Sequence, residues 1–174
     1  MDVVGGFIFS RTHRVVITLR LCQKAERMGW YGKVLLELCK VLHRISCHFA
    51  GVDFPWKTAI GPGLAITHGW GLVVNEGATI GANVTLFQGV TLGRSDRWDR
   101  DGRRISLFPT IEDEVWIGPH AIVVGGITVG RGSRIAGGAF VNKNVPAYSL
   151  VLGNPAEVVK NNVIPDVFNR YPYS

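Results

Sequence analysis

Aliphatic residues recur at every sixth position from residue 111 to residue 145. The members of this register are Ile111, Ile117, Val123, Val129, Ile135 and Val141. A period of six matches neither the 3.6-residue period of an amphipathic helix nor the two-residue alternation of a half-buried strand. It is typical of the hexapeptide repeat of a parallel β-helix, in which each short strand buries one aliphatic side chain and glycine or asparagine occupies the turns. The pattern therefore predicts a mainly β fold.

The same register begins upstream, at Ile60 and Ile66, and is interrupted twice. The first interruption is an insertion of two residues within the segment HGWG at 68–71, after which the register resumes. Three hexapeptides complete one triangular coil, so residues about 18 positions apart are expected to stack. The predicted stacked pairs are Val74 with Leu92, Ile111 with Val129 and Ile117 with Ile135.

The second interruption is longer and polar. Residues 94–109, RSDRWDRDGRRISLFP, contain no aliphatic repeat and are too many for a turn. Loops of this length in compact domains are usually functional or disordered. We therefore expect a loop extruded from one corner of the prism, whose arginines would clamp an anionic acceptor or nucleotide. An ordinary solvated loop explains the run of charges equally well.

Residues 1–50 follow a different pattern. Residues 11–28 and 33–49 place apolar side chains at three- and four-residue steps, which predicts two helices separated by Gly29. Because the terminal coil of a solenoid exposes unpaired strand edges, we interpret these helices as a hairpin that caps one end. A separate substrate-specific domain is the alternative. The resulting division is 1–50 helical cap, 51–160 β-helix and 161–174 C-terminal tail, with a helical start at Glu157.

Composition narrows the classes of partner. The net charge is +6, which suits binding of nucleic acid, an acidic membrane or a phosphorylated small molecule. The sequence has no RNA-binding or zinc motif and no apolar run of about 18 residues, so we expect neither nucleic acid nor a membrane span. Residues 3–9 are apolar but lack the length, charged start and cleavage site of a signal peptide. The three cysteines, Cys22, Cys39 and Cys47, lie in the helical region and are typical of reduced cysteines in a cytoplasmic protein.

The histidine in the two-residue insertion is the first candidate for acid–base chemistry. Bulges in regular structure often aim a side chain at a site, and Gly69 and Gly71 permit an unusual backbone path beside His68. A general base needs a partner that fixes its tautomer. Asp53 lies close to one coil earlier and can stack near His68. The alternative is that His68 caps a turn and Asp53 caps the exit of the helix.

The other histidines indicate less. His13, His43 and His48 lie in the helical segment and are interpreted as surface or half-buried residues, and His120 should face outward from a repeat. Metal binding would need three converging ligands, and His68 and His120 have no third partner in the solenoid. We expect no metal site.

Two long segments resemble the hexapeptide-repeat acyltransferases, and within them the serine acetyltransferase branch. They are DFPWKTAIGPGLAITHGWGLVVNEGATIGANVTLFQGVTLG and VWIGPHAIVVGGITVGRGSRIAGGAFVNKNVPAYSLVLGNPAEVV, and together they span roughly residues 51–160. The resemblance implies a left-handed triangular prism, although handedness rules alone would favour the reverse. It also implies a homotrimer, acetyl-CoA as donor, active sites between neighbouring subunits, and Asp53 and His68 as the catalytic pair.

The sequence departs from that branch at two places. Thr67 stands where serine acetyltransferases have an aspartate, and Leu107-Phe108-Pro109 replaces an Arg-His-Pro element. The ammonium and carboxylate of serine need charged partners, so these changes argue against serine as the acceptor. With the short helical segment, they favour the short capsule, colanic-acid-type and lipopolysaccharide O-acetyltransferases. We therefore expect a hydroxyl of a sugar or cell-surface glycan as the acceptor.

The expected acceptor contacts are drawn from the insertion and the long loop. They are Thr67, Trp70, Arg94 and Phe108. Packing at a subunit interface is the alternative role for the aromatic residues. Three other functions stay open: a serine O-acetyltransferase with a reworked pocket, transfer to an amine on a nucleotide sugar, and a non-catalytic trimeric scaffold.

A donor site for acetyl-CoA has simple physical needs. The pantetheine arm requires a narrow groove lined by small residues, which Gly118, Ala136 and Gly137 supply. By resemblance, the phosphates meet basic groups, and the further cofactor contacts are Trp116, Asn142, Lys143, Pro146 and Lys160. The predicted reaction is direct transfer, with His68 as general base and no covalent intermediate.

Overall fold

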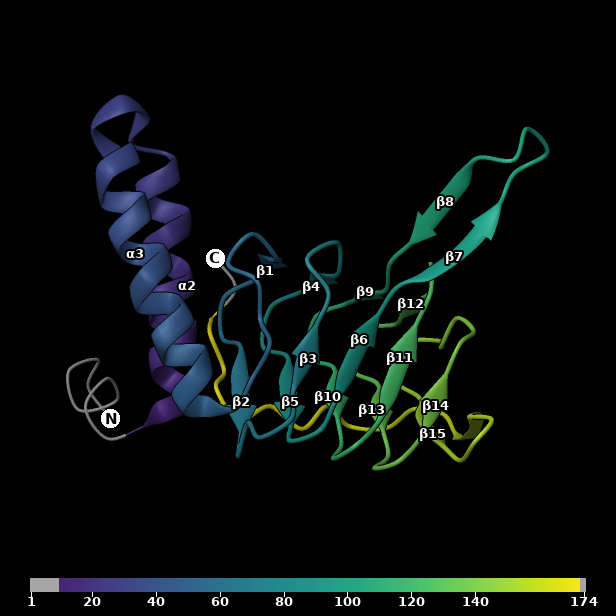
Figure 1. The fold of residues 1–174 in the computed structure, drawn as a ribbon. Helices are drawn as coiled ribbons and strands as arrows, with labels where there is room; N and C mark the ends of the chain where they lie inside the picture. The colour runs from purple at the N-terminus through teal and green to yellow at the C-terminus, as the bar shows by residue number, and fades with distance from the viewer. Residues whose placement is uncertain (1–9, 173–174) are drawn as a thin grey trace.

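The computed structural model describes residues 10–172 as a two-helix hairpin set against one end of a β solenoid (Figure 1). Helix α2 spans Arg11–Glu26 and helix α3 spans Gly29–Ala50. Both predicted helices are present, and the second begins earlier than its apolar pattern indicated. The interpretation of residues 3–9 and the first part of the 1–50 segment lie outside the described residues.

The two helices approach each other through small residues. A Cβ at Gly32 would lie 2.1 Å from the carbonyl oxygen of Ala25 on α2, so only glycine fits at this crossing. Gly51 closes α3 with φ 64°, the left-handed conformation that favours glycine at this position. A Cβ at Gly51 would also lie 2.1 Å from the Trp70 ring, so the same glycine admits the indole from the inserted segment.

The apolar face whose spacing predicts α3 is mostly exposed. Val34, Leu38 and Val41 are 82%, 57% and 56% exposed. The buried positions of the helix are Gly32, Cys39, His43 and Ala50. The periodicity thus predicted the helix correctly but not the side that packs within the chain, because close packing against α2 selects small side chains. His43 is also a correction, since it is 5% exposed rather than a surface or half-buried residue.

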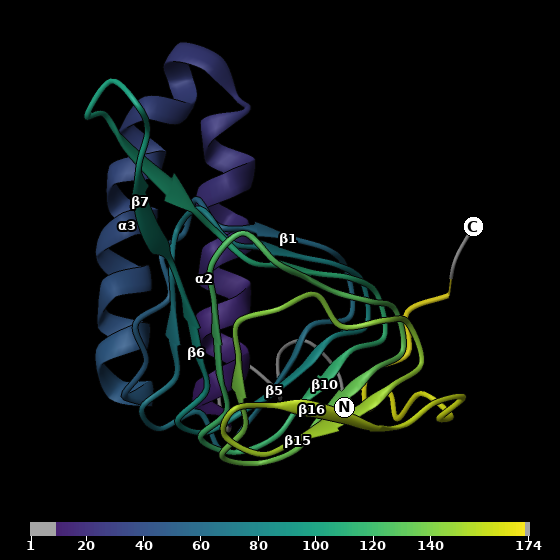
Figure 2. The same ribbon diagram turned by 90° about the vertical axis from the view of Figure 1, so that its right-hand side faces the viewer.

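The solenoid is a prism with three sheets as its faces, and Figure 2 shows its triangular section. Face A contains β3 (Val73–Val74), β6 (Thr91–Gly93), β11 (Ile122–Val124) and β14 (Phe140–Val141). Face B contains β1 (Ala59–Ile60), β4 (Thr79–Ile80), β9 (Thr110–Ile111) and β12 (Thr128–Val129). Face C contains β2 (Ala65–Thr67), β5 (Thr85–Phe87), β10 (Trp116–Ile117), β13 (Arg134–Ile135), β15 (Leu150–Leu152) and β16 (Glu157–Lys160).

The observed register confirms the predicted stacking. Parallel pairing joins Val74 to Leu92, Ile111 to Val129, and Ile117 to Ile135. Ile66 pairs with Leu86, so the coil that contains the HGWG segment is two residues longer than a regular coil. Each inward aliphatic is enclosed by those of the neighbouring coils, which makes one continuous apolar core along the prism.

The polar interruption projects from the A–B corner as an antiparallel hairpin (Figure 1). Strand β7 (Ser95–Trp98) pairs with β8 (Arg104–Leu107), and Asp96 accepts hydrogen bonds from Arg104 and Ser106. The Arg104 guanidinium beside Asp96 lowers the pKa of that carboxyl to about 2. The extruded loop is therefore confirmed. Its strand pairing gave no sequence signal, because these exposed positions do not alternate between a core and solvent.

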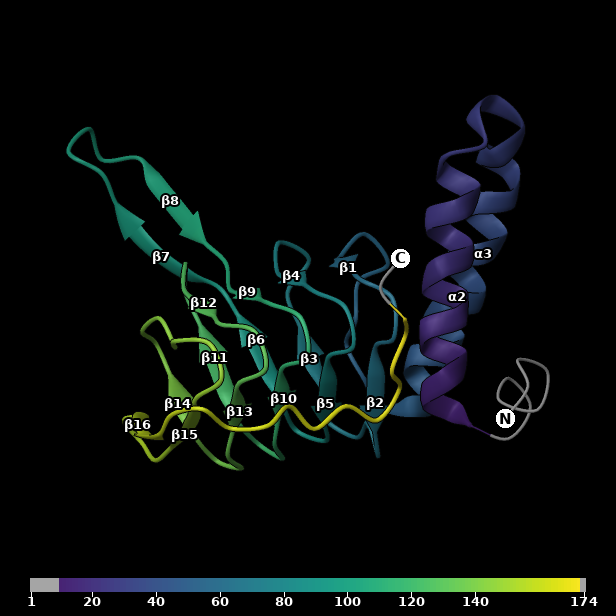
Figure 3. The same ribbon diagram turned by 180° about the vertical axis from the view of Figure 1, so that it is seen from behind.

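At the far end of the prism, β16 pairs antiparallel with β15 and occupies the edge of face C. The predicted helical start at Glu157 is wrong, because the open strand edge there is satisfied by strand pairing. The remaining tail returns along the outside of the prism toward the helices (Figure 3). It is fastened by reciprocal hydrogen bonds between Asn83 and the Tyr171 backbone, at 2.6 and 3.1 Å, and by an ion pair between Arg134 and Asp166 at 3.1 Å.

The helical hairpin contacts the first coil through α2. Val15 and Leu19 belong to the same buried cluster as the solenoid core. The Arg20 guanidinium donates to the Gly61 carbonyl at 2.7 Å, and Gln23 donates to the Thr58 carbonyl at 3.0 Å. These contacts support the interpretation of the hairpin as an end cap, while the boundaries at residues 50 and 160 stay a prediction. Neither helix in residues 10–172 has the length and apolar content that a bilayer span needs.

Candidate active site

His68 occupies the C–A corner of the prism, in the coil that carries the two extra residues. Its backbone has φ 65°, and Gly69 and Gly71 on either side of Trp70 have φ 78° and 74°. A positive φ is uncommon for a residue other than glycine and is characteristic of tight turns and functional sites. The imidazole is exposed and forms no hydrogen bond within residues 10–172. The corner therefore presents this side chain outward, free to contact a ligand.

Asp53 lies on the connector that leads from α3 into the solenoid. The connector is laid against the inserted segment: Gly71 N–H donates to the Gly51 carbonyl, and Asp53 N–H donates to the Leu72 carbonyl, both at 2.8 Å. Val74 N–H returns a bond to the Asp53 carbonyl at 2.8 Å. The structure thus brings the backbones of the two predicted catalytic residues into adjacent coils. In the described part of the chain, no hydrogen bond joins the Asp53 carboxylate to the His68 ring.

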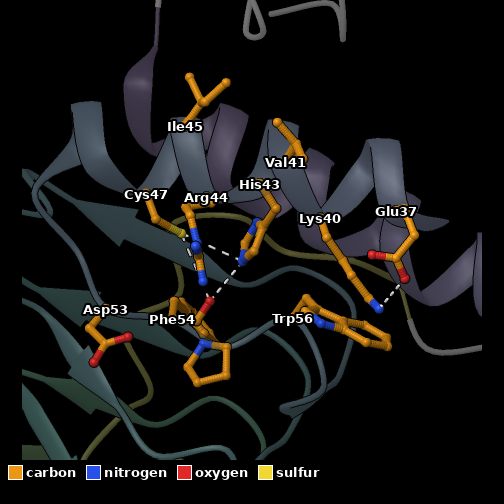
Figure 4. Close-up of a pocket in the computed structure, with 11 residues that line it drawn as sticks. Glu37, Lys40, Val41, His43, Arg44, Ile45, Cys47, Asp53, Phe54 and Trp56 are labelled. Carbon is orange, nitrogen blue, oxygen red and sulfur yellow. Dashed lines mark hydrogen bonds and ion pairs between the residues drawn. The ribbon is translucent and has the colours of Figure 1, made fainter. Parts of the chain in front are cut away.

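Asp53 is one of the residues that line a cavity of about 740 Å³ between α3 and the connector (Figure 4). The helix contributes Glu37, Lys40, Val41, His43, Arg44, Ile45 and Cys47, and the connector contributes Asp53, Phe54, Pro55 and Trp56. Lys40 is paired with Glu37 at 2.7 Å and lies 5.5 Å from the Trp56 ring centroid. This cavity could not be predicted from the sequence, because its two walls, residues 37–47 of α3 and residues 53–56 of the connector, meet only in the fold.

Two predicted acceptor contacts flank His68 but face elsewhere. Thr67 points outward from face C and lines a cavity of about 310 Å³ with the start of α2 and Phe168 of the tail. The Trp70 ring lies over Gly51, with the Arg11 guanidinium 4.5 Å from its centroid. Trp70 therefore joins the helices to the inserted segment in this structure.

The other two predicted contacts lie at a different corner. Arg94 and Phe108 line a cavity of about 680 Å³ at the base of the β7–β8 hairpin. Phe108 packs on the backbone of Gly77, where a Cβ would lie 2.6 Å from its ring, and Arg94 lies 3.5 Å from Asp96. Within one chain, the A–B corner is therefore separate from the C–A corner that carries His68.

A groove on face C gathers four of the predicted cofactor residues. Trp116, Ala136, Gly137 and Lys160 line a cavity of about 620 Å³ together with Arg134 and the start of the tail. The Trp116 Nε1–H is buried and has no hydrogen-bond partner among the described residues. A buried donor of this kind fits a ligand acceptor, such as an amide or phosphate oxygen. At Gly118, a Cβ would lie 2.8 Å from both the Trp116 ring and the Gly137 nitrogen, so glycine is required below the groove.

The remaining cofactor candidates are not part of that groove. Asn142 and Lys143 follow β14 at the A–B corner, and Pro146 lies in the next turn, where its carbonyl accepts from Ser133 Oγ at 2.7 Å. Arg134 was not predicted as a site residue, and its guanidinium lies 4.9 Å from the Trp116 ring centroid. The coil period could have found it, since Arg134 pairs directly with Trp116 in face C. Residues 10–172 contain no cluster of three or more potential metal ligands.

Comparison with known proteins identifies the solenoid. Residues 108–143 match the family described as bacterial transferase hexapeptide (six repeats). A serine acetyltransferase of Bacillus pumilus is 41% identical over 134 residues, which cover 77% of this chain and 59% of that protein. The chain therefore spans less than two thirds of this curated relative.

Solved structures agree with that match. A serine acetyltransferase from Brucella abortus in complex with coenzyme A aligns with a TM-score of 0.74 and 27% identity over 94% of this chain and 66% of that one. Soybean serine acetyltransferase complexed with serine aligns with a TM-score of 0.73 and 29% identity, covering 89% of this chain and 60% of that one. These alignments confirm the left-handed parallel β-helix.

The expectation of a sugar or glycan acceptor, in polysaccharide biosynthesis, is wrong, because the similar proteins are serine acetyltransferases. That expectation rested on Thr67 and on Leu107-Phe108-Pro109. In the structure, Thr67 faces α2 and the tail, and Phe108 packs on Gly77, so within one chain neither side chain shares a cavity with His68. The fold and the repeat family together identify the solenoid of this chain as that of a hexapeptide-repeat acyltransferase.

Proposed function

We propose that this protein transfers the acetyl group of acetyl-CoA to the hydroxyl of serine. The observation that carries the proposal is the exposed imidazole of His68 in the two-residue insertion, beside the connector that bears Asp53. The serine acetyltransferases at about 40% identity support the reaction and the acceptor. This acceptor replaces the glycan hydroxyl expected from sequence.

In the proposed mechanism, His68 takes the proton of the serine hydroxyl as the oxygen attacks the thioester carbon. Asp53 holds the imidazole in the tautomer with Nε2 free and stabilises the imidazolium that forms. Acetyl-CoA supplies the acetyl group as a thioester. His68 then returns the proton to the departing thiolate sulfur. The solenoid in residues 51–160 contains no cysteine, so direct transfer fits the sequence better than a thioester on the enzyme.

We assign the donor to the face C groove. Trp116 offers its unsatisfied N–H, and Gly118, Ala136 and Gly137 leave room for the pantetheine arm. Lys160 provides positive charge for phosphates, while Arg134 lies over the Trp116 ring and is paired with Asp166. Asn142, Lys143 and Pro146 stay as predicted contacts that a neighbouring subunit would have to bring to the donor.

We also propose a homotrimer with active sites between subunits. The separation of the His68 corner from the Arg94 and Phe108 corner supports it, because only a second copy can bring those two corners together. Hexapeptide-repeat transferases of this type are trimeric. A cytoplasmic location stays a prediction.

The test is a coenzyme A release assay with L-serine and a panel of other hydroxyl compounds, including threonine, glycerol and simple sugars. We expect release to depend on serine and to fall by about 100-fold or more in His68→Ala, since general base catalysis contributes about 10²–10⁴ in rate. Release that is equal with and without serine, or a His68→Ala variant within a few-fold of the parent, would contradict the proposal.

A further inference from the structure

A second histidine lies beside Asp53, buried where α2, α3 and the connector meet. His43 Nε2 lies 2.7 Å from the Phe54 carbonyl oxygen (Figure 4), and its Nδ1 lies 2.9 Å from the Thr18 hydroxyl on α2. Phe54 is the residue after Asp53, and its ring is buried in the solenoid core. The imidazole therefore links both helices to the connector at the peptide next to the predicted catalytic carboxylate.

The hydrogen-bond partners fix the protonation of this ring. A carbonyl oxygen only accepts, so Nε2 carries a proton. Burial lowers the pKa of His43, which favours the neutral ring with Nδ1 as an acceptor. The Thr18 hydroxyl then donates to Nδ1, although the Arg14 carbonyl at 2.7 Å is a competing acceptor. The resulting chain runs from Thr18 O–H to His43 Nδ1, and from His43 Nε2–H to the Phe54 carbonyl.

Asp53 is consequently held from two sides. On the solenoid side, its N–H and carbonyl bond to Leu72 and Val74 of the next coil. On the helix side, His43 holds the carbonyl of the following residue. Together, these bonds fix the backbone on both sides of Asp53, at the edge of the cavity of Figure 4.

A nucleophilic role for the adjacent cysteine does not fit. Cys47 Sγ lies 3.5 Å from His43 Nε2, a distance that suits a cysteine–histidine pair. Such a pair needs a lowered thiol pKa and a protonated imidazole. Burial, with the charge of Asp53, instead raises the pKa of Cys47 to about 11, and the pKa of His43 is lowered. Both shifts favour the uncharged groups, so Cys47 remains a thiol.

We propose that His43 is a positioning residue for the active site: through the Phe54 carbonyl, it sets the placement of the Asp53 carboxylate toward His68. This inference rests on the proposed function for the role of Asp53, and goes beyond it by assigning the helical hairpin a part in catalysis. Outer hydrogen-bond partners of metal ligands typically contribute about 10- to 100-fold to activity, and we expect an effect of the same order for His43.

The kinetic test compares His43→Ala, His43→Gln and Cys47→Ala. We expect His43→Ala to lower kcat with serine by about 10- to 100-fold while leaving KM for acetyl-CoA within about twofold, since the donor groove lies on another face. His43→Gln keeps an N–H for the Phe54 carbonyl and should recover most of the loss. Cys47→Ala removes only the long thiol contact with the same Phe54 carbonyl, at 3.8 Å, and keeps the His43 bond, so it should stay within about twofold of the parent.

A double-mutant cycle separates positioning from general damage. If His43 acts through Asp53, adding His43→Ala to an Asp53→Asn variant should lower kcat little further than Asp53→Asn alone does. Val15→Ala, a buried truncation on α2 in the same core, should instead multiply its effect with Asp53→Asn. If the losses of kcat caused by His43→Ala and Asp53→Asn multiply in the double variant, the inference is overturned.

A second readout is independent of the acceptor. ¹⁵N shifts of His68 in selectively labelled protein report which ring nitrogen carries the proton. We expect the Nδ1–H tautomer in the parent and the same shift toward Nε2–H in both Asp53→Asn and His43→Ala. An unchanged tautomer in His43→Ala refutes positioning even if serine is turned over. Conversely, a parent that does not acetylate serine refutes the proposed acceptor, and the tautomer still decides the role of His43.

Discussion

His43 is buried between the two helices and the connector, whereas His68 is exposed at a corner of the prism. His68 sits in a visible break of the hexapeptide register, between residues that permit a positive φ, so the sequence alone marked it as a candidate. His43 lies on an amphipathic helix, where a histidine has no distinguishing pattern. Its importance comes from Phe54 and Thr18, which are far from it along the chain and meet it only in the fold.

The burial of His43 predicts a pH dependence of stability. Its pKa is lowered in the folded state relative to an ordinary histidine, at about 6.5, so the unfolded chain binds the additional proton first as the pH falls. The free energy of unfolding should therefore decrease as the pH drops below about 6.5. Urea unfolding between pH 8 and pH 5 measures this, and His43→Gln should show a shallower dependence. An equal slope in parent and variant would show that other groups dominate.

Trp116 allows a test of the donor groove with little change in packing. Trp116→Phe removes the unsatisfied N–H but keeps a ring against Phe87, whose centroid is 4.7 Å away. We expect the variant to bind coenzyme A about 5- to 10-fold more weakly, because one hydrogen bond is lost. Calorimetry measures the change. Stability should not fall, because the parent leaves that donor unpaired. The matched control is Trp98→Phe, an exposed tryptophan on the hairpin that should bind coenzyme A as the parent does.

At the level of elements, the six-residue period predicted most of the solenoid. It placed the inward aliphatic residues, the stacked pairs and the two interruptions, because each coil repeats the same steric requirement. It could not predict β16, since that strand forms to satisfy the open edge of β15 rather than to bury an apolar face. The three- and four-residue spacing of α3 likewise could not predict which side of the helix is buried, because the contacting residues there are small.

Ile117 tests the register of that period directly. It is fully buried between Leu86 and Ile135, so Ile117→Ala should lower the free energy of unfolding by about 2–5 kcal/mol. The same change at Ile164, which is 86% exposed on the tail, should cost no more than about 0.5 kcal/mol. Urea unfolding of the two variants makes the comparison. Similar losses would show that position 117 does not point into the core.

The β7–β8 hairpin should affect function more than folding. Replacing residues 97–103 with two glycines removes its exposed tip and keeps Leu107 and Phe108 packed on Gly126 and Gly77 at the base. We expect the free energy of unfolding to change by no more than about 0.5 kcal/mol. Serine-dependent release should fall at least about tenfold if the hairpin reaches a neighbouring active site. A variant with full activity would limit the hairpin to a solvated surface role.

At the level of the whole molecule, the sequence predicted the interior better than the exterior. A repeat fixes what each coil buries, whereas the outer surface is determined by whatever binds there. Val34, Leu38 and Val41 on α3 remain exposed in the single chain, although their spacing is that of a packed face. The acceptor was mispredicted for a related reason: it was inferred from Thr67 and Phe108, whose surroundings depend on the tail and the solenoid surface rather than on the repeat.

A shared active site predicts complementation between inactive subunits. His68→Ala chains keep the hairpin, and chains with residues 97–103 replaced keep His68, so a trimer that mixes the two can assemble sites with both parts intact. When equal amounts of the two chains assemble at random, about one quarter of the sites contain both an intact His68 and an intact hairpin. Co-refolded protein should therefore recover about a quarter of the parent activity. Each variant refolded alone should stay inactive. Sedimentation should give three chain masses for the active fraction, and a mixture no more active than its components would place the hairpin and His68 in independent roles.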